Sequence, residues 1–297
     1  MRILRLAAVL VAVSGLLLGC SSADPQKPNR PPSLAQAKQV EVTKLLVFIV
    51  ENHSLDQMRD GMPFTFGLAE KYGYATDFTA IRHPSLPNYL AITGGSTFDV
   101  INDQPPAING VSGASVFGQA VALGKTARLY ADAMPQNCTG GNVGRYAVRH
   151  NPWAYYLDEA SLCQQYDVPL DALAGDIASG NLPNAGMVIP DVCHDAHDCP
   201  LAAADHWLRE QVTQVLAGPD FASGHLMVVL TADESEGGDD NIVLTTVIHP
   251  ALQGVVADSP LSHYSLTRLY DEVLGAEPLR EAAQAPSMLT AFGLRQP

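Results

Sequence analysis

The sequence predicts an α/β fold, a three-layer α/β/α sandwich around a mostly parallel central sheet. Three continuous apolar runs, within 40–50, 184–190 and 225–231, have the character of buried strands. Apolar runs without polar alternation are typical of parallel strands that are covered on both faces. Segments with helical character, over 200–216 and 264–274, flank these runs. Strands that alternate with helices build a sheet with helices on both sides.

The N-terminal segment predicts export. Residues 1–19 have a short basic start and an apolar run over 6–18 that is too short to span a bilayer comfortably, which is the pattern of a signal peptide. The run ends in Leu-Leu-Gly-Cys, which resembles the lipobox of bacterial lipoproteins, so Cys20 would carry the lipid. An ordinary secretory signal with an incidental cysteine is the alternative. Both interpretations predict export.

The rest of the chain divides into a tether and one domain. Residues 20–39 are rich in proline, serine and other polar residues and lack an apolar period, which predicts a flexible tether behind the anchor. Residues 40–297 suffice for a single large domain, and nothing in their composition demands a second. We expect a lipoprotein of the cell membrane or outer membrane whose domain faces the periplasm or the exterior.

The net charge argues against one class of partner. The chain carries a formal charge of −14 at pH 7. A protein this acidic is repelled by nucleic acid and by anionic membrane surfaces, so neither is expected as its main partner. Membrane contact is expected through the lipid anchor. A phosphate-ester substrate would need a local positive centre, which a metal ion would supply.

Four cysteines remain once Cys20 is assigned to lipid. An even number in an oxidising compartment predicts two disulfides. Three pairings exist, and Cys138–Cys163 with Cys193–Cys199 is favoured because each pair brackets a motif of the chain. A metal site is the alternative, but the spacing lacks the second thiol pair of a zinc ribbon.

Acidic and amide side chains follow each of the three predicted strands. They are Glu51 and Asn52 after the first run, Asp191 after the second, and Asp233 and Glu234 after the third. Ligands bind beyond the carboxyl ends of the strands in such sheets. Solvated turns explain any one of these acids, but three in register favour a divalent cation held by oxygen ligands, with His194, His197 and His263 nearby.

Ser85 is the candidate nucleophile. Pro87 suits the first turn of a helix and Gly94-Gly95 its end, so Ser85 is predicted at a helix N-terminus. Backbone N–H groups and the helix dipole at that end would hold a phosphate oxyanion. A serine that merely caps the helix is the alternative, and the local pattern does not decide between them.

Residues 51–56 (ENHSLD) begin a series of six short motifs. They resemble the ENHSFD motif of a bacterial phosphoesterase family that contains acid phosphatases and phospholipases C, within the alkaline phosphatase superfamily. Five further segments match in order: MPQNC (134–138), RYAVRHNPWAYY (145–156), VIPDVCHDAHDC (188–199), TADESEGGDDN (231–241) and SHYSL (262–266). The resemblance covers nearly the whole mature chain and implies an alkaline-phosphatase-like fold. The compact size is similar to that of the short secreted acid phosphatases.

The resemblance also implies roles for individual residues. The HPSLPNYL segment is similar to the segment around the nucleophile of related nucleotide pyrophosphatases, with Ser85 in the place of their threonine. The implied ligands of the metal beside the nucleophile are Glu51, Asn52, Asp233 and Glu234. A second metal site or its remnant is implied at Asp191, Asp195, His197 and His263. We therefore expect one or two divalent ions per chain, of Zn, Mn, Mg or Ca.

The remaining candidate side chains belong to substrate binding and proton transfer. We expect His83, Asn88 and Arg149 to contact the substrate. His150 is a candidate for phosphate contact or for protonating the leaving group, because an imidazole titrates near neutral pH. A serine is a weak nucleophile that metal coordination activates. The predicted chemistry is hydrolysis through a phosphoserine intermediate.

Three functions are compatible with these residues. The first is metal-dependent hydrolysis of phosphate monoesters, as in acid phosphatases. The second is a phosphodiesterase of the phospholipase C type, which uses the same nucleophile but accommodates a second ester group. The third is a non-catalytic surface lipoprotein that keeps the fold as a binding module. Competent side chains at Glu51, Asn52, Ser85, Asp233 and Glu234 argue against the third.

Overall fold

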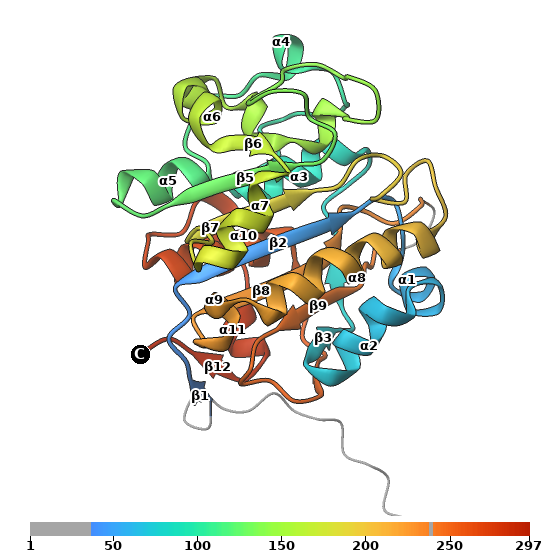
Figure 1. The fold of residues 1–297 in the computed structure, drawn as a ribbon, viewed down its shortest axis with the longest axis vertical. Coiled ribbons are helices and arrows are strands. Elements are labelled where there is room, and N and C mark those ends of the chain that lie inside the picture. Colours follow the sequence, from blue (N-terminus) through green and yellow to red (C-terminus); the bar gives the residue numbers. More distant parts are fainter. Residues whose placement is uncertain (1–36, 238–239) are drawn as a thin grey trace, which may run out of the picture.

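The computed structural model describes residues 37–237 and 240–297 (Figure 1). The predicted signal peptide, Cys20 and the tether up to residue 36 lie outside the described residues. The last two residues of the expected tether form strand β1 (Lys38–Gln39), which pairs in parallel with β12 (Leu294–Arg295). The folded domain therefore begins slightly before residue 40.

A mostly parallel sheet lies at the centre of the described domain and confirms the predicted α/β class. Eight strands of the described residues lie in the order β10-β3-β9-β8-β2-β7-β5-β6. Only β9 runs antiparallel to its neighbours within this sheet. In sheet order the bounds are Val255–Ala257, Gly73–Ala75, Thr245–Ile248, Leu226–Ala232, Lys44–Val50, Ala185–Ile189, Ala127–Ala131 and Asp167–Pro169. Strands β4 (Phe78–Thr79) and β11 (Leu261–Ser262) form a separate parallel pair.

The three predicted apolar runs are the adjacent central strands β8, β2 and β7. Val50 at the end of β2 pairs with Ala232 at the end of β8, and β7 ends beside them. All three strands are almost completely buried. Parallel pairing with this register brings the residues that follow these strands to one edge of the sheet.

Helices cover both faces of the sheet. One layer contains α1 (Leu55–Gly61), α2 (Pro63–Lys71), α7 (Ala172–Ser179), α8 (Leu201–Ala217) and α9 (Pro219–Ala222), with α8 crossing in front of the sheet in Figure 1. The other contains α3 (Ser85–Gly94), α5 (Val116–Ala122), α10 (His263–Leu274) and α11 (Met288–Ala291). The predicted helices over 200–216 and 264–274 are α8 and α10. The shorter helices are α4 (Pro106–Asn109), α6 (Ala160–Tyr166), η1 (Val148–His150), η2 (Pro152–Tyr155), η3 (Leu157–Glu159) and η4 (Arg280–Ala283).

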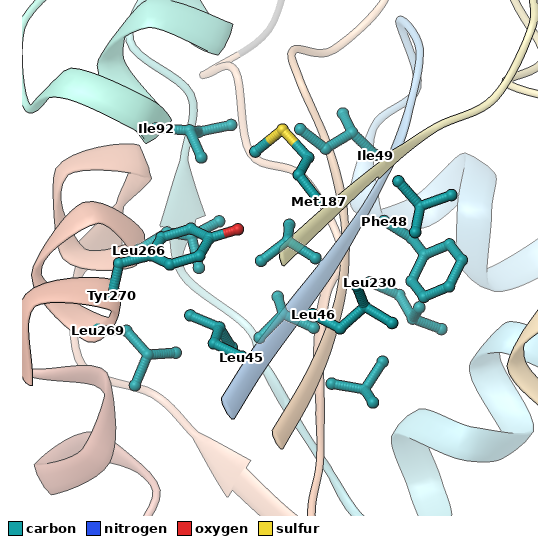
Figure 2. Close-up of a cluster of buried hydrophobic side chains, with 14 of the residues drawn as sticks. Leu45, Leu46, Phe48, Ile49, Ile92, Met187, Leu230, Leu266, Leu269 and Tyr270 are labelled. Atoms are coloured by element: carbon teal, nitrogen blue, oxygen red, sulfur yellow. The ribbon is translucent and has the colours of Figure 1, made fainter. Parts of the chain in front are cut away.

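Side chains of β2 pack against both helical layers (Figure 2). Leu45 lies toward α10, whereas Phe48 points to the opposite side and meets Trp207 of α8 edge to face, with ring centroids 6.4 Å apart. The Tyr270 hydroxyl of α10 donates to the Gly186 carbonyl at 2.7 Å, which satisfies its one polar atom in the core. Complete burial of an apolar side chain such as Leu45 or Phe48 contributes roughly 1.5–3 kcal/mol. Among the described residues, the helices are too short or too polar to cross a membrane.

Candidate active site

Helix α3 begins at Ser85, as the sequence predicted. Pro84 is the N-cap, so Ser85 is the first helical residue rather than the cap. Its hydroxyl donates to Glu51 Oε2 at 2.9 Å, and the side chain is buried. The helix ends at Gly95, whose φ of 65° is the left-handed conformation that glycine adopts without strain. The interpretation of Ser85 as a simple capping residue is therefore not supported.

Glu51 is the centre of a hydrogen-bonded group directly beyond β2. Besides Ser85, the Tyr89 hydroxyl donates to its carboxylate, and His150 Nε2 lies 3.2 Å from Oε2. The side chain is completely buried. Burial raises the pKa of Glu51, but His150 and these hydrogen bonds outweigh it and the pKa falls below its usual value. Glu51 is therefore held as a carboxylate.

Asp233 follows β8 and lies beside Glu51. Its Oδ1 accepts the backbone N–H of Asn52 at 3.0 Å, and Asn52 has a positive φ of 55° in the turn after β2. Asp233 Oδ2 is buried and has no hydrogen-bond partner among the described residues. Burial, with the charges of Glu51 and Glu234, raises the pKa of Asp233 well above its usual range. A buried carboxylate with one unsatisfied oxygen is costly without a cation.

Glu234 connects this group to two predicted substrate-binding side chains. Asn88 Nδ2 donates to its Oε2 at 3.1 Å, and His83 Nδ1 lies 3.0 Å from the same atom. Burial and the neighbouring charges of Glu51 and Asp103 raise the pKa of Glu234 to about 8. The His83 side chain is 42 % exposed, so it reaches this group from the solvent side.

The donor set fits a divalent cation. Asp233 and Glu234 lie close enough to Glu51 to be influenced by its charge: burial first, and the Glu51 charge second, raises the pKa of both. Asp233 Oδ2 is an open oxygen donor, and the Ser85 hydroxyl stands beside Glu51. Hard oxygen ligands of this kind suit Mg²⁺, Mn²⁺, Ca²⁺ or Zn²⁺. Among the described residues, Glu51 has ligand atoms within 4.8 Å of those of His150 and Asp195 rather than of Asp233 and Glu234 together, so the predicted ligand set stays a prediction.

His150 lies behind Glu51 rather than at the surface. Its Nε2 faces Glu51 and its Nδ1 lies 3.1 Å from Asp195 Oδ2, while its ring stacks on Tyr89 with centroids 5.5 Å apart. Burial lowers the pKa of His150, but the two carboxylates more than reverse this and raise it to about 9. The buried imidazolium links Glu51 to Asp195. Direct contact with a substrate, as the sequence analysis expected, is not favoured by this position.

The four residues expected at a second metal site do not come together. Among the described residues, Asp191 clusters with Asp132 and His194, whereas Asp195 clusters with Glu51 and His150. His197 is exposed and hydrogen-bonds Arg149 and Asp198, and His263 Nε2 lies 2.5 Å from the Asp233 carbonyl. Burial lowers the pKa of His263 to about 4, so this imidazole is neutral.

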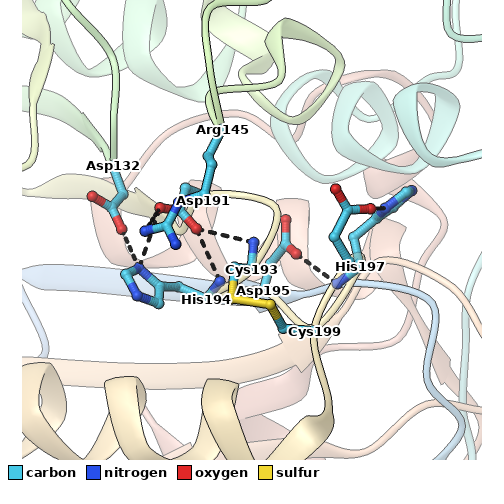
Figure 3. The surroundings of a disulfide bond; sticks show 9 residues. Asp132, Arg145, Asp191, Cys193, His194, Asp195, His197 and Cys199 are labelled. Carbon is cyan, nitrogen blue, oxygen red and sulfur yellow. Dashed lines mark hydrogen bonds and ion pairs between the residues drawn. A yellow bond between two sulfur atoms is a disulfide. The ribbon is translucent and has the colours of Figure 1, made fainter.

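Figure 3 shows the group around Asp191. Arg145 Nη2 lies 2.5 Å from Asp191 Oδ2, and His194 Nδ1 lies 2.6 Å from Asp132 Oδ2. Asp132 follows β5, which neighbours β7, but sequence reasoning missed it because Arg128 interrupts the apolar run of that strand. The sequence did contain a signal for Asp132, because this residue directly follows β5, as Glu51 follows β2 and Asp233 follows β8.

The helix N-terminus differs from the expectation in one respect. The Leu86 backbone N–H, expected to hold a phosphate oxyanion, donates to Asp103 Oδ1 at 2.9 Å. A carboxylate at a helix start satisfies one of its unpaired N–H groups. Asp103 lies in the loop between α3 and α4, so no local pattern could have identified it.

Both predicted disulfides are present. Cys138 bonds to Cys163, and Cys193 bonds to Cys199, with Cα atoms 5.3 and 4.7 Å apart respectively. The second closes the loop after β7 that carries His194, Asp195 and His197 (Figure 3). This loop also joins the strand end of β2, because the Glu51 N–H donates to the Asp195 carbonyl at 2.8 Å.

A family model named Phosphoesterase family matches residues 56–276. The chain belongs to this family. It is 26% identical to a phosphatidylinositol-3-phosphatase of Mycobacterium tuberculosis, over 98% of this chain and 95% of the relative. An acid phosphatase of Aspergillus fumigatus and a phosphate-repressible acid phosphatase of Penicillium chrysogenum are 26% and 29% identical, over 64% and 67% of this chain but only 46% and 51% of their own lengths. The Phosphoesterase-family chain is therefore a phosphoric ester hydrolase.

Solved structures confirm the fold of this Phosphoesterase-family member. An alkaline phosphatase superfamily protein from Vibrio parahaemolyticus matches with a TM-score of 0.58 at 10% identity, over 86% of this chain and 73% of that one. A phosphonate monoester hydrolase from Silicibacter pomeroyi matches with a TM-score of 0.57 at 12% identity, over 86% and 77%. At such identities these matches establish the alkaline-phosphatase-like fold alone.

Proposed function

We propose that the protein hydrolyses phosphate monoesters with Ser85 as nucleophile and one divalent cation beside it. The observation that carries this proposal is the Ser85 hydroxyl at 2.9 Å from a buried carboxylate, near Asp233, whose Oδ2 has no hydrogen-bond partner among the described residues. Ser85, Glu51, Asn52, Asp233 and Glu234 would hold the ion. It would favour the ionised serine oxygen and neutralise charge on the phosphoryl group.

Side chains of the protein position the nucleophile, accept its proton and contact the phosphoryl group. Glu51 orients the Ser85 oxygen and is the nearest acceptor for its proton, and Tyr89 and His150 hold Glu51 in place. Ser85 would attack phosphorus, the bond from phosphorus to the ester oxygen would break, and the leaving oxygen would take a proton from water. A second water would then break the phosphorus–serine bond, releasing phosphate and restoring the Ser85 hydroxyl. We assign His83 and Asn88, which both contact Glu234, to the phosphoryl group. His150 acts as a positioning residue.

The monoesterase interpretation is favoured over a phosphodiesterase of the phospholipase C type. The relative that matches almost end to end, and the acid phosphatases that match in part, are all named as phosphatases. A non-catalytic binding module is disfavoured because every residue at the site is chemically competent. Rates on a monoester, a diester and phosphatidylcholine, whose phosphate is a diester, measured in parallel, separate these functions. A clear preference for phosphatidylcholine would reject the monoesterase.

The Ser85→Ala variant tests the nucleophile. We expect turnover of an aryl phosphate to fall by at least about 10³-fold, because the attacking oxygen is removed while the rest of the site remains. Divalent metal content and the unfolding transition should stay near those of the wild type. Ser161→Ala, on exposed helix α6, is the matched control and should keep full activity. Activity of Ser85→Ala close to the wild type would reject this nucleophile.

We also propose that the domain is exported and anchored by lipid at Cys20. The two disulfides support export, since such bonds persist in oxidising compartments. Cys20→Ser should abolish incorporation of labelled fatty acid and release the protein from the membrane fraction. Unchanged lipid labelling in this variant would reject the anchor.

A further inference from the structure

A cavity of about 530 Å³ lies beside the start of helix α3. It falls within the range of about 300–1,000 Å³ that small-molecule sites occupy. Its lining consists of Asp103, Pro105, Gly141, Asn142, Val148, Arg149 and His197. None of these residues belongs to the carboxylate group around Ser85, and none is a phenylalanine, tyrosine or tryptophan.

The cavity adjoins the proposed nucleophile on two sides. On one side, Asp103 accepts the N–H of Leu86, the residue after Ser85. On the other side, Arg149 directly precedes His150. His150 Nε2 lies 3.2 Å from Glu51 Oε2, and the centroids of the His150 and His197 rings are 5.9 Å apart. Although Ser85 itself does not line the cavity, the lining thus includes the partner of the residue after Ser85 and the residue before His150, which faces Glu51.

The polar atoms of the cavity include both donors and acceptors. Arg149 Nη2 lies 3.0 Å from His197 Nε2, and His197 Nδ1 lies 2.7 Å from Asp198, so His197 uses its ring nitrogens within the protein. Among the described residues Arg149 has no ion-pair partner, which leaves its other N–H groups available. Asn142 Oδ1 accepts the Val148 N–H at 2.9 Å, which leaves its amide N–H₂ as a donor.

Asp103 supplies the acceptor on the side of helix α3. Its Oδ1 is used by Leu86, whereas Oδ2 has no hydrogen bond within the described part of the chain. A hydroxyl group both donates and accepts, so several hydroxyls on one ring match a cavity with donors at Arg149 and Asn142 and an acceptor at Asp103. An anionic group would meet the Asp103 charge, and an acyl chain would desolvate these polar atoms without replacing their hydrogen bonds.

We propose that this cavity binds the leaving alcohol of the substrate and selects a polyhydroxylated one, such as a sugar or cyclic polyol. This inference rests on the proposed function, because it names the alcohol side of the same ester. Arg149 and Asp103 determine the preference for a polyhydroxylated leaving alcohol. The substrate class is then a polyol phosphate rather than a phosphate of an apolar alcohol.

Two phosphates that share one ring test this inference. Inositol monophosphate and cyclohexyl phosphate differ in the ring hydroxyls, and we expect kcat/KM to favour the first by about tenfold or more, the factor that one well-placed hydrogen bond provides. Arg149→Met and Asp103→Asn should each reduce this ratio severalfold. Arg209→Met, an arginine of α8 stacked on Phe64, should leave the ratio unchanged.

The outcomes separate the two proposals. Equal kcat/KM values for the two ring phosphates, or a ratio unaffected by both cavity variants, would overturn the polyol site. If an inositol bisphosphate is hydrolysed faster than inositol monophosphate, and Arg149→Met removes this difference, the cavity binds an anion and the polyol site is overturned. If no ester is hydrolysed, the proposed function fails, and calorimetry of both ring phosphates with metal-loaded Ser85→Ala still decides the cavity. Tighter binding of the hydroxylated ring supports it, and equal binding rejects it.

Discussion

Two groups of acids at the same edge of the sheet differ in how completely basic side chains compensate their charges. The nucleophile cluster comprises Ser85, Glu51, Asp233 and Glu234, beyond β2 and β8. The Asp191 cluster comprises Asp132, Asp191, His194 and Arg145, beyond β5 and β7. Both clusters arise because parallel strands end at the same edge of the sheet. In the Asp191 cluster, Arg145 Nη2 lies 2.5 Å from Asp191 Oδ2, and His194 Nδ1 lies 2.6 Å from Asp132 Oδ2.

The difference lies in what neutralises each carboxylate. In the Asp191 cluster, Arg145 pairs with Asp191 and His194 pairs with Asp132, and Asp191 Oδ1 also accepts two backbone N–H groups. In the nucleophile cluster Asp233 Oδ2 has no partner within the described chain, and its pKa is raised. Acids at a strand end therefore indicate a cation site only where the protein does not supply its own cation.

The largest contrast is expected in activity. Glu51→Gln removes the charge that accepts the Ser85 hydroxyl and should lower kcat/KM by about 10²–10³-fold, as does the loss of one essential electrostatic contact in other enzymes. Asp132→Asn should change kcat/KM by no more than a few fold. Steady-state kinetics on an aryl phosphate measure both. Equal losses in the two variants would mean that the Asp191 cluster shares the chemistry.

The next contrast is in metal binding. We expect calorimetry to find one tight divalent ion per wild-type chain and none after Asp233→Asn, because Asp233 provides the open oxygen. Arg145→Met should expose the Asp132, Asp191 and His194 donors and add a second, weaker site. Removal of the Arg145–Asp191 ion pair would thus give the Asp191 cluster an open oxygen donor, as Asp233 Oδ2 is in the nucleophile cluster. Two ions bound to the wild type would contradict this assignment.

The smallest contrast is in the pH dependence of stability after chelation of metal. The folded-state pKa of Glu234 is about 8, above its ordinary value of 4.5, so its stabilising contribution is complete below about pH 4.5 and is lost as pH rises through about 8. Urea unfolding of the chelated protein should show this loss. Glu234→Gln should reduce this loss, while the raised pKa of Asp233 keeps part of it, and Asp132→Asn should leave it unchanged. A flat wild-type profile would reject the raised pKa.

The sequence located the three central strands because continuous apolar runs identify strands that are buried on both faces. It missed β5, whose run contains Arg128, and β3, β9 and β10, which have only three or four residues each. Asp132 was lost together with its strand. Local periodicity identifies an element only when the pattern is long and uninterrupted.

Candidate side chains were predicted well where they follow a recognised strand or helix start. Ser85 hydrogen-bonds Glu51, Asp233 accepts the N–H of Asn52, and both disulfides have the expected pairing. Asp103 was missed because it reaches helix α3 from a separate loop. His150 was identified as a candidate, but its burial between two carboxylates depends on contacts across the fold.

By itself, the sequence determined the class of fold, the strand ends that carry acids, and the serine at a helix start. These follow from burial patterns and chain direction, which are local properties. Only the tertiary structure decided which acids have a cationic partner: Arg145 neutralises Asp191, whereas Asp233 remains unsatisfied within the described chain. Charge compensation depends on distances of a few ångströms between residues far apart in the chain, and spacing along the sequence does not encode those distances.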